Sequence, residues 1–337
     1  MLADAEPIRE FRGDARDALS LPTSSGPVVL RGLVDHWPMV AAARESMRAA
    51  VAYLHGFVRA DAPPVIATVA APATGGRVFY NEDLSGMDFR QEQIPLPTVL
   101  DTLVKYADHA TPPMIYVAST TLDTWLPGFR RDNDLPLHGR DPLASIWIGN
   151  RTRIAAHQDV PDNLACVVAG RRRVTLFPPD QLRNLYIGPL DFTPAGQAIS
   201  LVDFSAPDLV RFPRFAEAMR HAQVADLGPG DAVLIPSLWW HHMEGLEPFN
   251  VLVNYWWRDV PDWMDTPMNA LMYALMTVRD LPRHERDAWK DVFRHYVFEA
   301  DDDTAAHIPE QARRLLSPLD EARARELRAR LLKRINR

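Results

Sequence analysis

The sequence predicts a mainly β fold with flanking helices. In the central part of the chain, short runs rich in β-branched and aromatic residues are separated by Gly and Pro, which is typical of an all-β sandwich or barrel. These runs are "PMIYVAST", "ASIWIG", "ACVVAG", "RRVTLFPP", "DAVLIP" and "VLVNYWW". The 29 prolines thin out sharply towards the end of the chain, so short elements and many turns are expected before that point. After about Asp259, apolar residues recur at helical spacing instead.

Two regions follow from this change of pattern. Residues 1–259 are predicted to form the β domain, with an N-terminal α/β extension: strands at 27–34, 64–70 and 76–80, and helices at about 38–54 and 96–107. Residues 260–337 are predicted to be helical. Three segments there carry the helical pattern, namely 265–281, 285–298 and a charged helix opened by Ser317.

Bulk composition excludes some classes of protein. The net charge of −7 argues against a general nucleic-acid or anionic-membrane binder, so no nucleic-acid partner is expected. The single cysteine, Cys166, cannot form an internal disulfide and fits a reducing compartment. No run approaches the roughly 18 apolar residues that span a bilayer, and the acidic N-terminus lacks the apolar core of a signal peptide. We expect a cytoplasmic protein without a membrane segment.

A histidine and an aspartate lie two residues apart in "RIAAHQDVPDN". Because side chains alternate along a strand, His157 and Asp159 face the same way. Together they are two members of a His-Asp-His facial triad, which can hold Fe(II) and leave positions open for other ligands. About one such pair is expected by chance in a chain of this composition, so a third ligand is needed.

The segment "GPGDAVLIPSLWWHHMEG" offers that third ligand. A turn leads into an apolar strand and then into His241 and His242. Adjacent strand residues face opposite ways, so only one of these two histidines can reach a shared metal.

This segment resembles the second metal-binding motif of the JmjC-type cupin 2-oxoglutarate oxygenases, the cupin-like group related to the asparaginyl hydroxylase of hypoxia-inducible factor. The same family's other motifs resemble "PVVLRGLVDHWP", "AHQDVPDNLACVVAGRRRVTLFPPDQLRNLYIGP", "DFSAPDLVRFPRF" and "VLVNYWW". The similarity spans roughly residues 21–257. It implies a double-stranded β-helix (cupin or jelly-roll) fold and a metal held by His157, Asp159 and His242, the second histidine of the pair.

Arg172 interrupts an apolar strand. It shares strand parity with Val174 and Leu176, so it is predicted to face the interior, where a guanidinium needs an anion. Arg171 and Arg173 face the other way, as exposed residues. The resemblance supplies the anion, because the family holds the distal carboxylate of 2-oxoglutarate fifteen residues after the first ligand. The usual residue there is lysine, and arginine offers a two-pronged donor in its place.

Further cosubstrate contacts are implied by the resemblance alone. They are Tyr116 at the same distal carboxylate, Asn163 and Asn254 near the metal, and Trp256 as an aromatic wall. The family's threonine three residues before the first ligand is replaced by Ile154, so one hydrogen bond is lost.

The resulting hypothesis is an Fe(II)- and 2-oxoglutarate-dependent dioxygenase that uses O₂ to hydroxylate a side chain of a protein or peptide, or a small molecule. Two alternatives stay open: a metal-binding cupin without oxygenase activity, and an inactive JmjC-like binding module. Loops at 121–140 and 191–215 are expected to frame the entrance, with Trp125, Arg130 and Arg131 as candidate substrate contacts. The C-terminal helices suggest a homodimer, as in related hydroxylases.

Overall fold

The computed structural model describes residues 5–11, 26–59, 61–137 and 139–336. The chain divides into two compact units, one ending at Arg258 and the other beginning at Asp259. This division coincides within a residue with the change from β to helical pattern in the sequence.

The first unit contains a sheet of eight strands. Their spatial order is β2 (Val28–Leu30), β12 (Ala232–Ile235), β9 (Asp162–Ala169), β14 (Asn250–Trp257), β7 (Leu143–Gly149), β6 (Met114–Thr121), β3 (Val65–Ala70) and β5 (Arg90–Ile94). Every residue of β9 is buried, so this strand is covered on both faces, and after Asp162 and Asn163 its residues 164–169 form a continuous apolar run.

A second sheet of six strands faces the first. Its order is β1 (Glu6–Pro7), β11 (Gln223–Leu227), β10 (Arg172–Phe177), β13 (Trp240–Gly245), β8 (Arg153–His157) and β4 (Arg77–Val78). One core cluster joins the two sheets, since Val167 of β9 and Leu252 of β14 pack with Val174 and Leu176 of β10. Two mostly antiparallel sheets around a shared interior confirm the predicted double-stranded β-helix.

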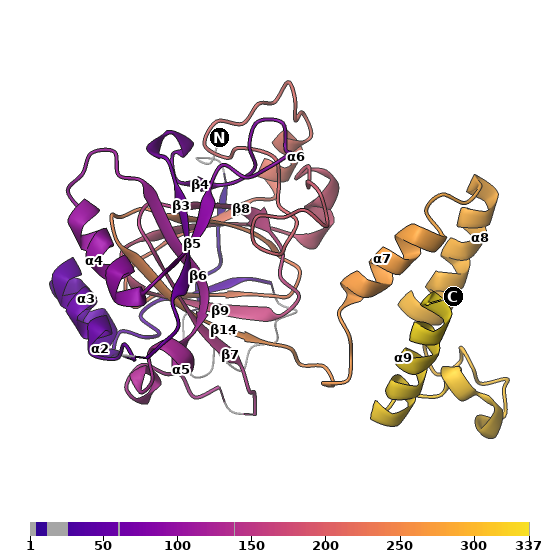
Figure 1. The fold of residues 1–337 in the computed structure, drawn as a ribbon. Coiled ribbons are helices and arrows are strands. Elements are labelled where there is room, and N and C mark those ends of the chain that lie inside the picture. The colour runs from indigo at the N-terminus through magenta and orange to yellow at the C-terminus, as the bar shows by residue number, and fades with distance from the viewer. Residues whose placement is uncertain (1–4, 12–25, 60, 138, 337) are drawn as a thin grey trace. The chain divides into compact units, whose positions relative to one another are not determined.

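Helices cover the outer face of the eight-stranded sheet, where α2 (Pro38–Glu45), α3 (Met47–His55) and α4 (Leu96–Tyr106) gather (Figure 1). The single helix expected at 38–54 is interrupted at Ser46, whose hydroxyl accepts a hydrogen bond from the Ala49 amide and begins α3. The remaining short elements of this unit are η3 (Pro72–Thr74), α5 (Leu122–Trp125), η4 (Phe129–Arg131), η5 (Pro179–Arg183) and α6 (Phe215–Arg220).

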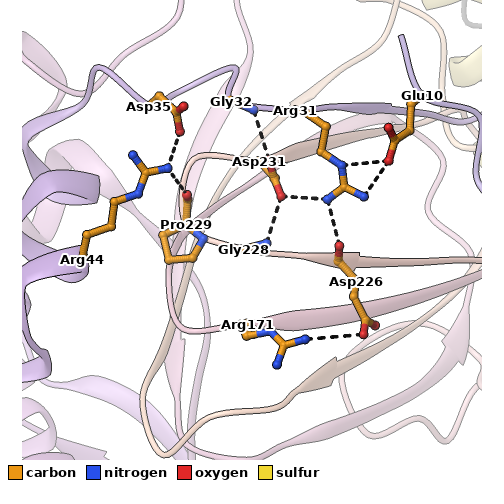
Figure 2. A network of polar contacts seen from close by, with 10 residues as sticks. All are labelled: Glu10, Arg31, Gly32, Asp35, Arg44, Arg171, Asp226, Gly228, Pro229 and Asp231. Atoms are coloured by element: carbon orange, nitrogen blue, oxygen red, sulfur yellow. Dashed lines mark hydrogen bonds and ion pairs between the residues drawn. The ribbon is translucent and has the colours of Figure 1, made fainter. Parts of the chain in front are cut away.

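A polar network ties the N-terminal segment to the turn between β11 and β12 (Figure 2). Arg31 pairs with Glu10 at 2.7 Å and with Asp231 at 2.8 Å. Gly230 lies in the same turn, and a Cβ atom added to it would clash with Asp35, whose Oδ1 would be only 1.8 Å away. The backbone φ of Gly230, +104°, also favours glycine. Arg171 joins the network through Asp226 at 3.7 Å.

The second unit, from Asp259, is helical. It contains α7 (Pro267–Thr277), α8 (Arg283–Phe293) continued by one π-helical turn η6 (Arg294–Phe298), the short turns η7 (Glu310–Ala312) and η8 (Arg314–Leu316), and α9 (Glu321–Ile335). Helix α9 begins later than the expected Ser317, because Asp320 accepts a hydrogen bond from the Arg323 amide and caps it. Among the described residues, none of the helices combines the length and hydrophobicity that crossing a bilayer demands.

Candidate metal centre

A pocket lies between the two sheets and opens to solvent. Its empty volume is about 820 Å³ including the open mouth. Its wall comes from strands of both sheets and from the loop before Ser200: Val78, Tyr116, Ala118, Trp147, Ile154, Ala155, His157, Asp159, Asn163, Arg172, Pro194, Ala195, Gln197, Ile199, His241, Met243, Leu252, Asn254 and Trp256. The wall is mainly apolar with a few polar groups, the composition of a small-molecule site.

Three side chains on this wall form a cluster that can hold a metal ion. One ligand atom each from His157, Asp159 and His241 lie within 4.8 Å of one another. The two imidazole rings are 4.2 Å apart between centroids. His241 Nε2 lies 3.5 Å from Asp159 Oδ2, too far for a well-formed hydrogen bond and close enough for a shared cation.

Backbone carbonyls fix the tautomers of both histidines. Nδ1 of His157 lies 2.9 Å from the Ala155 carbonyl, and Nδ1 of His241 lies 3.0 Å from the Trp239 carbonyl. Because a carbonyl only accepts, each Nδ1 carries the proton and donates it. Nε2 is then the metal-binding atom of each ring, an arrangement common in histidine metal sites.

His242, the third ligand expected from the resemblance, is the wrong member of the pair. Its ring packs on Phe204, with centroids 4.6 Å apart, and its Nε2 lies 3.9 Å from Glu244. In the pairing of β13 with β10, His242 is opposite Thr175. In the pairing of β13 with β8, His241 is opposite His157. His241 is therefore the histidine of this pair that faces the other two ligands.

The charges of the cluster suit a cation. Burial, reinforced by the His241 ring, lowers the pKa of His157 to about 4. Burial raises the pKa of Asp159, but the neighbouring His241 and His157 rings and the Gln197 amide outweigh it and lower that pKa to about 2. At neutral pH His157 is thus neutral and Asp159 ionised, which are the protonation states that metal binding requires.

Arg172 of β10 and Tyr116 of β6 both line the pocket. Arg172 is only 3% exposed, as strand alternation predicts, and within the described ranges its Nε has no hydrogen-bond partner. Burial lowers the pKa of Arg172, while the nearby Tyr116 acts in the opposite direction. Burial also raises the pKa of Tyr116, so its hydroxyl stays a neutral donor. A buried guanidinium beside a neutral hydroxyl is a site for an anionic group.

The outer neighbours of Arg172 behave differently. Arg173 pairs with Asp226 at 2.8 Å, and Arg171 approaches the same carboxylate. Both are partly or largely exposed, in line with the predicted alternation of the arginine triplet.

The two asparagines lie together on the pocket wall. Asn254 Nδ2 donates to Asn163 Oδ1 at 3.2 Å, and Trp147 Nε1 donates to Asn254 Oδ1 at 2.7 Å. Trp256 packs edge-on against Trp147, with centroids 5.7 Å apart, and its Nε1 has no partner. Ile154 also lines the pocket.

The three candidate substrate contacts do not line the pocket. Trp125 Nε1 donates to the Pro63 carbonyl, and Arg131 is exposed beside Asp132. Arg130 forms ion pairs with two carboxylates, those of Asp123 and Asp134.

This prediction was wrong because the described residues 121–137 pack on the helix-covered side of the eight-stranded sheet. Asp134 also accepts a hydrogen bond from Tyr255, the β14 residue between the pocket residues Asn254 and Trp256. Tyr255 therefore points to the side opposite the pocket. By contrast, the 191–215 loop does contribute to the pocket, through Pro194, Ala195, Gln197 and Ile199.

Sequence reasoning missed Trp147 and Gln197. Trp147 alternates with buried Ile146 and Ile148 in "ASIWIG", so its inward position could have been inferred from the strand period. Gln197 lies in a loop without periodicity, and no sequence signal marks it.

The polar groups of this pocket fit a divalent transition metal at the histidines and Asp159, and a bound carboxylate at Arg172. Two imidazoles and one carboxylate on one side of an open pocket match the facial arrangement typical of non-haem Fe(II). Asp159 Oδ2 and Arg172 Nε are both buried, and neither has a hydrogen-bond partner in the part of the chain that the structure describes. Such atoms are costly unless a cation meets the first and an anion the second.

Fold and site together define a double-stranded β-helix protein with a His-Asp-His cluster in an open interior pocket. Residues 20–263, more than half of the 337-residue chain, match the family described as "Cupin-like domain". The chain belongs to this family.

Several curated proteins are similar to parts of the chain. It is 35% identical over 132 residues to "Lysine-specific demethylase JMJ31" of Arabidopsis thaliana, covering 37% of this chain and 24% of that protein. It is 33% identical over 161 residues to "HSPB1-associated protein 1" of Rattus norvegicus, covering 46% and 33%. It is 38% identical over 105 residues to "tRNA wybutosine-synthesizing protein 5" of Danio rerio, covering 31% and 29%. The matched regions thus span a third or less of each relative's own length.

Proposed function

We propose that this protein is an Fe(II)- and 2-oxoglutarate-dependent dioxygenase that hydroxylates its substrate. The observation that carries the proposal is the shared pocket: the ligand atoms of His157, Asp159 and His241 lie on the same wall as the buried Arg172. A cation site and an anion site in one cavity fit a metal and a dicarboxylate cosubstrate that bridges them.

When bound, Fe(II) with 2-oxoglutarate and O₂ supplies the oxidising power to insert one oxygen atom into a C–H bond, with succinate and CO₂ as co-products. The chain's own residues bind and orient. Arg172 pairs with the far carboxylate of the cosubstrate, and the Tyr116 hydroxyl donates to it. Asn163 and Asn254 brace the wall nearer the metal, while Trp256 and the aliphatic residues exclude water.

A direct test measures succinate formed from 2-oxoglutarate by the full chain with added Fe(II), with and without candidate substrates. In parallel, the anaerobic protein is titrated with keto acid, and a visible absorption band that requires both Fe(II) and the keto acid is expected. Metal binding with no keto-acid binding would favour a cupin without oxygenase activity. Partner binding that survives loss of the metal cluster, with no turnover, would favour an inactive binding module.

The substrate class we propose is a side chain of a protein or peptide, or a small molecule. The pocket is open and mainly apolar, and the loop at 191–215 forms part of its wall. The names of the relatives include a demethylase and a tRNA-modifying protein. The net charge of −7 gives this chain no overall attraction for a nucleic acid.

We further propose that residues 260–337 mediate homodimerisation. Helix α7 exposes a row of apolar side chains, each 39–69% accessible: Met268, Leu271, Met272, Tyr273 and Met276. Helix α8 and the turn after it add Trp289, Val292, Tyr296, Val297 and Phe298. Apolar surface this extensive on one small helical unit is typical of a protein contact.

Light scattering on the full chain is expected to give twice the 38.0 kDa monomer mass. Placing a charge in this surface with Met272→Glu and Met276→Glu should yield monomers, because an interface desolvates the new carboxylates. Val210→Glu is the matched control, since Val210 is a 95% exposed apolar residue of the first unit and its replacement should leave the dimer intact. A monomeric wild type, or a dimer that survives deletion of residues 260–337, would refute the proposal.

A further inference from the structure

The loop of residues 189–198 is held firmly at its base. Gly188 N donates to the Ile199 carbonyl at 2.9 Å, and Leu201 N donates to the Tyr186 carbonyl at 3.0 Å. Ser200 N donates to the Ala156 carbonyl at 2.7 Å, which attaches the base to β8, the strand that carries His157. The loop is thereby fixed close to the metal cluster.

Beyond its base, hydrogen bonds attach the loop to the rest of the described part of this unit at two further points. Tyr80 donates its hydroxyl proton to the Phe192 carbonyl, and the two rings lie 5.7 Å apart. At the other point Gln197 Nε2 donates to Asp159 Oδ1 at 3.0 Å. Only the second attachment touches a residue of the cluster.

The bond from Gln197 makes the two oxygens of Asp159 unequal. Oδ1 is occupied by the amide donor, whereas Oδ2 has no hydrogen-bond partner among the described residues and lies 3.5 Å from His241 Nε2. An oxygen that already accepts a hydrogen bond is a poorer metal ligand, and the amide also stops the carboxylate from rotating.

We propose that Gln197 is a positioning residue that reserves Asp159 Oδ2 as the single metal-binding oxygen of that carboxylate. The inference rests on the proposed function. A carboxylate bound through one oxygen gives three protein ligand atoms in total, so an octahedral ion keeps three positions. These suffice for a chelating keto acid and one further ligand, whereas a carboxylate bound through both oxygens would take one of them away.

The test is a titration of the metal-free full chain with Co(II), followed by visible absorption. Gln197→Met keeps the length of the side chain and removes the amide donor. It is expected to weaken Co(II) binding by about 10–100-fold, the usual cost of losing a residue that orients a ligand. It is also expected to change the visible spectrum of bound Co(II), because coordination through both carboxylate oxygens would take one of the ion's remaining positions and alter its geometry.

Tyr80→Phe is the matched control. It removes the hydrogen bond of the loop's other attachment, to the Phe192 carbonyl, and leaves Gln197 in place. Its Co(II) affinity and spectrum should match those of the wild type. Comparison of the two variants separates carboxylate orientation from simple fastening of the loop.

A weaker affinity and a changed spectrum in Gln197→Met alone would support the inference. An unchanged spectrum in that variant, or equal effects in Tyr80→Phe, would overturn it and leave the proposed function standing. A wild-type chain that binds neither Co(II) nor keto acid would defeat the proposed function, and this inference with it.

Discussion

Replacing His241 with alanine is expected to abolish metal binding, whereas replacing His242 is expected to leave it nearly intact. His241 supplies one of three ligand atoms that lie within 4.8 Å of one another, so its loss should cost more than the roughly 10–100-fold typical of an outer partner. His242 packs on Phe204 outside the pocket wall. Isothermal titration with Mn(II), and turnover of 2-oxoglutarate with Fe(II), measure both effects.

The free energy of unfolding provides the control for the His241→Ala and His242→Ala variants. His242 is buried, so His242→Ala should lower the free energy of unfolding by about 1–3 kcal/mol through lost packing. Urea denaturation of the metal-free variants separates folding from metal binding. If His242→Ala remained folded and lost the metal while His241→Ala retained it, the ligand set described above would be wrong.

Replacing Arg172 with methionine is expected to have opposite effects on cosubstrate binding and on stability. The guanidinium is 3% exposed, and among the ion pairs of the described residues none involves it. Losing one partner of a buried charge pair costs about 2–5 kcal/mol, which corresponds to a roughly 30- to several-thousand-fold weaker affinity for 2-oxoglutarate. Without the keto acid, removal of a poorly compensated buried charge should leave the free energy of unfolding unchanged or raise it.

Arg173→Met is the matched control for Arg172→Met. It changes the neighbouring arginine, which pairs with Asp226 on the outer side of the sheet. Keto-acid titration of the Fe(II)-loaded variants should show wild-type affinity for Arg173→Met and weak binding for Arg172→Met. Equal affinities in the two variants would show that the distal carboxylate is held elsewhere.

The sequence alone predicted much of the fold, because the patterns on which it depends are local. Alternating apolar runs with Gly and Pro between them indicate strands, and the change near Asp259 coincides with the observed boundary of the helical unit. Strand alternation also separated Arg172 from its two neighbours, since Arg172 is buried and Arg173 reaches Asp226. The break at Ser46 was missed, although a serine before an apolar run is a recognised helix-starting signal.

The position of the 121–140 segment could not be predicted from its sequence. Trp125, Arg130 and Arg131 are residue types common in substrate contacts, but tertiary packing places the described residues 121–137 on the helix-covered side of the sheet. The same limit applies to Gln197. Its bond to Asp159 joins residues 38 positions apart in sequence, across a loop without periodicity.

The sequence by itself determined that one histidine of the pair 241–242 faces the pocket beside His157 and Asp159, because adjacent strand residues point to opposite sides. Only the tertiary structure decided that it is His241. The decision lies in the pairing of β13 with β8, where the register shifts so that His241 is opposite His157 and Met243 is opposite Ile154. A step of two residues along β13, from His241 to Met243, therefore matches a step of three along β8, from His157 to Ile154. Alternation counted along either strand alone cannot reveal such an irregularity.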